Sequence, residues 1–188
     1  MTKLAVFLSG AGSNARNLCS YFAGHPEIEV ALLLTNNKDS GVAGIAQDFD
    51  IPYLVFNKAD LYETGEVLQQ LTDYKVDAII LAGFLWLVPK NLLDRYPKMI
   101  INIHPALLPK YGGKGMFGMK VHESVFQNKD AESGITIHVC NELYDEGDIL
   151  FQARCEVNMD DTPETIAQKV YALEQEFFPA VVEEYLSR

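Results

Sequence analysis

The chain has 188 residues, 48% of them hydrophobic, and a formal net charge of −11. This length predicts one domain spanning residues 1–188, and the acidic charge disfavours a nucleic-acid partner, because binding to a phosphate backbone needs a basic surface. No apolar run is long enough to cross a membrane, and the first residues resemble a strand rather than a signal peptide, so we expect a cytoplasmic protein without a membrane partner. The three widely spaced cysteines favour neither a disulfide framework nor a metal site.

Short apolar runs alternate with amphipathic segments along the first half of the chain. The predicted strands are residues 4–8, 30–34, 53–56, 78–81 and 99–103. The predicted helices between them are residues 14–23, 42–49, 64–72 and 89–96. This alternation is typical of βαβ units, and it predicts a Rossmann-like α/β fold with an open, mostly parallel twisted sheet and helices on both faces.

The pattern changes in the second half of the chain. A glycine-rich loop at 111–118 precedes a predicted helix at 119–128, and two strands at 134–139 and 149–157 follow closely enough to pair antiparallel. The last helix begins with Thr162 as its N-cap and Pro163 in its first position. An apolar stripe at helical spacing predicts that this helix belongs to the core: Ile166, Val170, Leu173, Phe177 and Val181.

The segment SGAGSNA (residues 9–15) connects the first predicted strand to the first predicted helix. Its small residues satisfy the dinucleotide pattern G-x-G-x-x-A, but the acidic residue that should end the second strand is missing, since Asp39 comes late. We therefore favour a monophosphate bound at the helix N-terminus by Gly12, Ser13 and Asn14. A tight turn that binds no ligand is the alternative.

The run MIINIHPALLP (residues 99–109) carries Asn102 and His104 two positions apart, so both side chains point to one face of an extended segment. The proline that follows ends the strand and leaves both groups at its carboxyl end, where open α/β sheets bind their ligands. A buried pair satisfied by its neighbours is the alternative. The acidic segment 138–148 is either a solvated hairpin loop or brings Asp145 back to His104.

Four segments, LSGAGSN, LAGF, NIHPALLP and the stretch from His138 through Asp145 to Gly147, together resemble the folate-dependent formyltransferases. The resemblance covers essentially the whole chain. It implies transfer of a formyl group from 10-formyltetrahydrofolate, the co-substrate, to the amine of 5-phosphoribosylglycinamide in purine biosynthesis. The reaction would be a direct acyl transfer through a tetrahedral intermediate, without a metal.

The resemblance also implies roles for individual residues. The implied catalytic residues are Asn102, His104 and Asp145. The residues implied to bind the ribonucleotide are Gly12, Ser13, Asn14 and Glu174. The residues implied to line the formyl-folate pocket are Leu85, Trp86, Leu87, Val88, Asn102, Asn141, Glu142, Leu143 and Tyr144. The chain departs from many members at Trp86, where they have Arg, and the resemblance implies a cis Leu108–Pro109 bond.

The chemistry of acyl transfer explains the need for these groups. The Asn102 amide and a protonated His104 imidazole would donate to the oxyanion of the tetrahedral intermediate, and the Asp145 carboxylate is expected to raise the pKa of His104. A formyltransferase acting on an amino sugar nucleotide is the nearest alternative. A non-catalytic nucleotide-binding domain would need only the glycine loop, and a nicotinamide dehydrogenase would need the missing acidic residue. We expect small-molecule partners and a monomer or homodimer.

Overall fold

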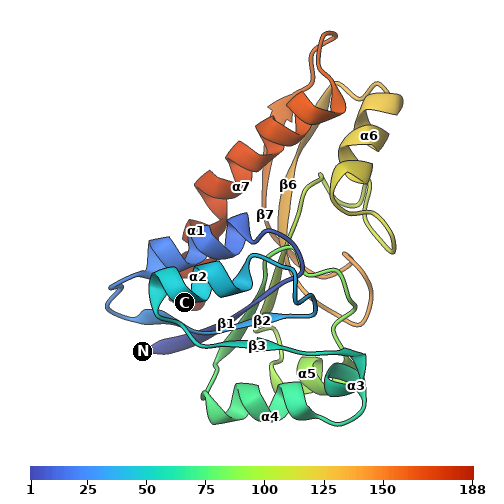
Figure 1. Cartoon of the computed structure of the whole chain (residues 1–188). Coiled ribbons are helices and arrows are strands. Elements are labelled where there is room, and N and C mark those ends of the chain that lie inside the picture. Colours follow the sequence, from blue (N-terminus) through green and yellow to red (C-terminus); the bar gives the residue numbers. More distant parts are fainter.

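The structure, a computed structural model that describes residues 1–188, contains a seven-stranded sheet in the order β3-β2-β1-β4-β5-β6-β7 (Figure 1). Its strands are β1 (Thr2–Leu8), β2 (Ile28–Thr35), β3 (Tyr53–Val55), β4 (Ala78–Leu81), β5 (Ile100–His104), β6 (Glu132–Val139) and β7 (Ile149–Glu156). The first five pair in parallel, while β6 is antiparallel to both β5 and β7. The predicted fold class, with its antiparallel C-terminal pair, is confirmed.

Helices cover both faces of this sheet (Figure 1). They are α1 (Ser13–Phe22), α2 (Val42–Phe49), α3 (Lys58–Tyr62), α4 (Glu66–Asp73), α5 (Lys90–Arg95), α6 (Met119–Gln127) and α7 (Pro163–Leu186). One face carries α1, α2 and α7, and the other carries α3, α4 and α5. No helix combines the length and apolar character that a membrane crossing would require.

The alternation of apolar side chains along β1 builds two cores from one strand. Leu4, Val6 and Leu8 pack into the cluster beneath α1, α2 and α7. Ala5 and Phe7 pack into the cluster beneath α3, α4 and α5. Because all of these side chains are buried, β1 has no polar face, as expected for the centre of a parallel sheet.

The predicted elements are confirmed within two residues at each end, but α3 was not predicted. This five-residue helix is specified by its cap rather than by an apolar period. Asn57 accepts hydrogen bonds from the backbone N–H groups of Ala59 and Asp60, and the Asp60 carboxylate accepts from the Asn57 N–H at 2.8 Å. Only Leu61 of the helix is buried, so there was no apolar stripe to detect.

Helix α7 begins with Thr162 as its N-cap and Pro163 in its first turn, as predicted. Within the predicted stripe, Ile166 and Val170 are buried, whereas its other members are only partly buried. The fully buried residues further along are Phe178 and Val182. The buried row therefore follows a strict spacing of four residues, and its middle position is occupied by a carboxylate, Glu174.

Candidate functional site

A cavity of about 560 Å³ opens beside the carboxyl end of β5. The strand order reverses next to this point, because β1 lies between β2 and β4, and open α/β sheets bind ligands outside such a switch point. Its lining includes a set of polar and titratable side chains: Asn14, Asn102, His104, His122, Asp145 and Glu174. Residues far apart in the sequence therefore meet in one concave site.

Strand β5 places Asn102 and His104 on one face, as predicted, and ends at His104 just before Pro105. The neighbouring Ile101 and Ile103 pack into the opposite core cluster. The loop that follows turns through a Leu108–Pro109 bond that is cis, as predicted. Antiparallel pairing with β6 sets His138 directly opposite Asn102.

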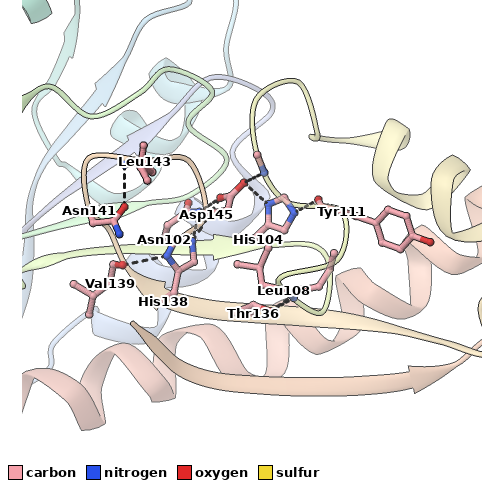
Figure 2. Close-up of polar contacts among 12 residues, drawn as sticks. Asn102, His104, Leu108, Tyr111, Thr136, His138, Val139, Asn141, Leu143 and Asp145 are labelled. Carbon is pink, nitrogen blue, oxygen red and sulfur yellow. Dashed lines mark hydrogen bonds and ion pairs between the residues drawn. The ribbon is translucent and has the colours of Figure 1, made fainter. Parts of the chain in front are cut away.

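His104 is 4% exposed and is held by two contacts (Figure 2). Its Nε2 donates to the Tyr111 carbonyl at 2.7 Å, and its Nδ1 lies 3.6 Å from Oδ2 of Asp145. Burial lowers the pKa of His104, and this effect outweighs the raising effects of the Asp145 charge and the Tyr111 carbonyl. Asp145 raises the pKa of His104, as predicted, but the sequence contains no measure of the burial that lowers this pKa overall.

Asp145 contacts His104, His138 and Asn102 and so connects the polar cluster (Figure 2). Its backbone has a φ of 56°, in the left-handed region, and its Oδ2 accepts a hydrogen bond from the Gly113 N–H at 2.9 Å. Burial alone would raise the pKa of Asp145, but the contact with His138, the charge of His104 and the Gly113 N–H together lower it. The segment 138–148 is therefore not a solvated hairpin loop, because it returns an ionised carboxylate to the end of β5.

His138 completes the cluster, and the sequence analysis did not select it as a site residue. Its Nδ1 lies 3.2 Å from the Val139 carbonyl, and its Nε2 lies 3.0 Å from Nδ2 of Asn102 and 3.6 Å from Oδ1 of Asp145. The same Nδ2 makes a longer contact of 3.4 Å with Oδ1 of Asp145. The alternation of Thr136 and His138 on β6 was the available signal, but its use required the register between β5 and β6.

The far end of the cavity contains a second carboxylate. Glu174 Oε2 accepts from Nδ2 of Asn14 at 2.9 Å, and burial raises the pKa of Glu174 although this hydrogen bond opposes the shift. Gly12 is the N-cap of α1 with a φ of 82°, and a Cβ on it would lie 2.6 Å from the Ile45 side chain. Asn14 and Glu174 line the cavity, whereas Gly12 and the exposed Ser13 lie outside its lining.

Most of the residues predicted to bind formyl-folate line a smaller cavity of about 50 Å³ that adjoins the first. Those lining it are Trp86, Leu87, Val88, Asn102, Asn141, Leu143 and Tyr144. Leu85 lines the larger cavity instead, and the exposed Glu142 lines neither. The two cavities share Asn102 and Asp145, so the polar cluster lies where they meet.

Trp86 belongs to an aromatic group beside this smaller cavity. Its ring centroid lies 6.1 Å from that of Phe56 and 6.4 Å from that of Tyr62. The Lys58 ammonium lies 5.6 Å from the centre of the same ring, within the range of a cation–π interaction. The residue that departs from the family pattern is thus packed among neighbours that suit an indole.

His122 and Tyr171 also line the larger cavity, although neither was selected from the sequence. His122 is 6% exposed, its Nδ1 has no hydrogen-bond partner, and burial lowers its pKa. Its position depends on the path of the loop between β5 and α6, which no local sequence pattern specifies.

Neither a cluster of metal ligands nor an activated thiol is present near these cavities. No group of three or more His, Cys, Asp or Glu side chains is arranged to hold a metal ion. The three cysteines are free, and burial raises the pKa of Cys19 to about 12 and raises that of Cys140 as well. Burial therefore favours the protonated thiol over the nucleophilic thiolate.

The fold and the polar cluster define a Rossmann-like protein with titratable side chains gathered at a strand end, and sequence comparison gives its family. The profile of the family described as "Formyl transferase" matches residues 2–182. The chain therefore belongs to the formyl transferase family, as predicted. It is 34% identical over 193 residues to a phosphoribosylglycinamide formyltransferase of Bacillus subtilis, with coverage of 99% of this chain and 95% of that protein.

Other relatives and solved structures agree. The chain is 46% identical over 188 residues to a chloroplastic phosphoribosylglycinamide formyltransferase of Arabidopsis thaliana, with coverage of 96% of this chain. It spans only 64% of that relative's length and 60% of the length of a Vigna unguiculata relative. The crystal structure of glycinamide ribonucleotide transformylase 1 from Geobacillus kaustophilus has a TM-score of 0.88 at 30% identity and covers 99% of both chains.

Proposed function

We propose that this chain transfers the formyl group of 10-formyltetrahydrofolate to the amine of 5-phosphoribosylglycinamide, a step of purine biosynthesis. The observation that carries the proposal is that Asp145 contacts both His104 and Asn102 where the two cavities meet. One cavity is available to each substrate, and the reacting atoms would meet beside these three residues. The relatives from Arabidopsis thaliana and Bacillus subtilis are phosphoribosylglycinamide formyltransferases, which supports the same choice of acceptor.

The ribonucleotide occupies the larger cavity. Its phosphate binds at the N-terminus of α1, where the backbone N–H groups after Gly12 are free and the side chains of Ser13 and Asn14 are within reach. Glu174 accepts hydrogen bonds from the ribosylglycinamide portion. This arrangement suits an acidic protein, because the anion is held by local amides and not by a basic surface.

The formyl-folate enters from the smaller cavity, between residues 85–88 and the loop 141–145. A volume of about 50 Å³ is far below the roughly 300 Å³ or more of a typical ligand pocket, so the loop moves outward when the donor binds. Asn141 holds this loop through a hydrogen bond from the Leu143 N–H at 2.9 Å. Donor binding is therefore coupled to the segment that carries Asp145.

The acceptor amine attacks the formyl carbon, which forms a tetrahedral intermediate with a negatively charged oxygen. The Asn102 amide hydrogen that makes only the long 3.4 Å contact with Asp145 is free to turn to this oxyanion, while His138 holds the other. The bond from the formyl carbon to the folate nitrogen then breaks. The proton lost by the amine passes to that nitrogen through a water held by Asp145.

A protonated His104 would be the stronger donor to the oxyanion, yet burial lowers its pKa in the empty site. Binding of a phosphate and of the anionic folate raises this pKa again, because negative charges favour the imidazolium. In the empty site Nε2 of His104 donates to the Tyr111 carbonyl, and during the reaction it donates to the developing oxyanion instead. Substrate binding thus shifts His104 toward its charged form.

We further propose that residues 1–188 act as one catalytic domain in the cytoplasm, with these two small molecules as partners and with no nucleic-acid partner. The net charge of −11 supports the last point, since it opposes binding to a phosphate backbone. The chain would act as a monomer or a homodimer.

The test is to incubate the protein with 10-formyltetrahydrofolate and glycinamide ribonucleotide and to follow the loss of formyl-folate. An Asp145→Asn variant prepared in the same way is the matched control for contaminating activity, and it should lose most of the rate. An amino sugar nucleotide serves as the competing acceptor. Turnover with the amino sugar and not with the ribonucleotide would contradict the proposal.

A further inference from the structure

Helices α1 and α7 are joined by a row of amide hydrogen bonds behind the ribonucleotide end of the cavity. Asn14 Nδ2 donates to Oε2 of Glu174 at 2.9 Å, and Gln175 Nε2 donates to Oδ1 of Asn14 at 2.8 Å. Asn14 and Glu174 line the cavity, but Gln175 does not. Gln175 can therefore affect a ligand only through its two neighbours.

The backbone of Gln175 is anchored to α1 as well. Pro179 lies within α7 and has no N–H, so the Gln175 carbonyl one turn earlier has no partner inside the helix. Asn17 Nδ2 supplies the missing donor at 2.9 Å. Because Asn14 and Asn17 are three residues apart, they lie on the same face of α1, and both contact Gln175.

This arrangement fixes which end of the Asn14 amide faces Glu174. An Asn side chain has a donor end and an acceptor end, and Gln175 presents a donor that only Oδ1 can accept. Nδ2 is thereby directed at the Glu174 carboxylate. A rotation of the amide by half a turn would bring its oxygen against a buried negative charge, which is unfavourable. The hydrogen bond from Asn14 opposes the rise in the Glu174 pKa that burial causes.

We propose that Gln175 is a positioning residue for the acceptor substrate, and that it acts by orienting the Asn14 amide toward Glu174. The inference rests on the proposed function, since it concerns the binding of the ribonucleotide. It predicts an effect on the apparent affinity for the ribonucleotide alone, because the formyl-folate pocket and the Asn102, His104 and Asp145 cluster lie beyond this row of hydrogen bonds.

The first experiment compares Gln175→Ala with the unaltered protein in the formyl-transfer assay. The KM for glycinamide ribonucleotide should rise about 5- to 20-fold, in line with loss of a hydrogen bond beside a charged group. The kcat and the KM for 10-formyltetrahydrofolate should stay within about twofold. Gln168→Ala is the matched control, since Gln168 is an exposed glutamine of the same helix, and it should change none of these constants.

Two further variants separate positioning from a merely structural role. Gln175→Glu keeps the shape of the side chain but offers an acceptor, so the Asn14 amide turns its nitrogen to residue 175 and its oxygen to Glu174. Its KM for the ribonucleotide should rise more than in Gln175→Ala. The double variant Asn14→Ala with Gln175→Ala should have the same KM as Asn14→Ala alone, because Gln175 acts only through Asn14.

The outcomes distinguish this inference from the proposed function. If the unaltered protein does not formylate the ribonucleotide, both are overturned. If it does, and Gln175→Ala leaves the KM for the ribonucleotide unchanged or alters kcat and both KM values alike, only the inference is overturned. Additive effects in the double variant would also overturn it.

Discussion

Asp145 and Glu174 are both partly buried carboxylates in one cavity, yet their pKa values shift in opposite directions. Asp145 faces His104 and His138 and accepts from a backbone N–H, so its ionised form is well compensated. Glu174 has only the Asn14 amide as a partner, so desolvation dominates. The ionised form of a carboxyl group is therefore stabilised at the Asp145 end of the cavity and destabilised at the Glu174 end.

We predict that Glu174→Gln stabilises the protein, and more so at higher pH. Because the pKa of Glu174 is higher in the folded than in the unfolded protein, the folded protein binds more protons. The contribution of Glu174 to stability is therefore largest below pH 4.5. It declines as the pH rises from 4.5 to the folded-state pKa. Glutamine does not titrate and escapes this decline. Thermal unfolding should show a larger gain in Tm at pH 7.5 than at pH 5, with about 2–4 °C for each kcal/mol.

The exposed neighbour Glu176 gives the matched control, and Glu176→Gln should change the Tm little at either pH. An equal shift of Tm for Glu174→Gln at both pH values would contradict the desolvation argument. Formyl transfer should fall in the Glu174→Gln variant. The Glu174 carboxylate destabilises the protein without substrate, but we expect the same carboxylate to bind the acceptor.

We also predict that Asn102→Ala, His104→Ala and Asp145→Ala each lose about 10²-fold or more of the rate, the usual loss for one donor to an oxyanion. His104 ends β5, Asp145 lies in a loop and the Asn102 side chain lines the cavities, so the fold should survive, which circular dichroism can verify. Asp148→Ala, in the same acidic loop but outside both cavities, is the control and should remain active. Near-normal turnover by His104→Ala would rule out the proposed mechanism.

At the level of helices and strands, apolar periodicity was enough to predict most of the fold. The alternation around Asn102 and the proline after His104 predicted where β5 ends, and the cap at Thr162 predicted where α7 begins. Helix α3 was missed because a cap alone specifies it. The buried row of α7 was displaced in its second half because packing against α1 and the sheet, and not the local sequence, determines which face is covered.

Local sequence patterns predicted the relative positions of site residues only where those residues lie in one continuous segment. Asn102 and His104 share one strand, so their common face follows from alternation. His138 needed the register of β5 with β6, and His122 needed the path of a loop, neither of which local patterns contain. The pKa of His104 could not be predicted either, since its direction depends on how deeply tertiary packing buries the ring.

The contact between α2 and the loop before α1 yields another prediction. The Gly41 N–H donates to the Gly10 carbonyl at 3.0 Å, and a Cβ on Gly41 would lie only 2.0 Å from the Ala11 carbonyl oxygen. Gly41→Ala must therefore push the loop away from α2. We expect a loss of about 1–3 kcal/mol in the free energy of unfolding, measured in urea, and a higher KM for the ribonucleotide.

Gly44→Ala is the matched control for this substitution. Gly44 is exposed within the same helix, and a Cβ on it would meet no atom within 4 Å. Alanine there should stabilise α2 by up to about 1 kcal/mol through helix propensity. Equal effects of the two substitutions would show that the close approach of Ala11 has no energetic weight.

At the scale of the whole molecule, ligand selection has to overcome a net charge of −11. We predict that glycinamide ribonucleotide raises the Tm and that NAD does not, since the N-terminus of α1 suits one phosphate and the second strand ends without the acidic residue that a dinucleotide needs. At 100 times Kd the stabilisation is about 2.7 kcal/mol, or roughly 5–10 °C for a chain of this size.

Asn14→Ala should abolish most of this shift in Tm, which links the stabilisation to the start of α1. Stabilisation by NAD, with none by the ribonucleotide, would instead favour a dinucleotide-binding protein and overturn the assignment of the larger cavity.

The position of Trp86 allows donor binding to be followed by intrinsic tryptophan fluorescence. Trp86 is the only tryptophan in the chain, so the indole emission comes from one place, next to the smaller cavity. The Lys58 ammonium above the ring and the nearby Tyr62 define its surroundings in the empty protein. A folate that opens this cavity must change those surroundings and absorb the emitted light, and donor occupancy becomes a fluorescence titration that needs no label and no turnover.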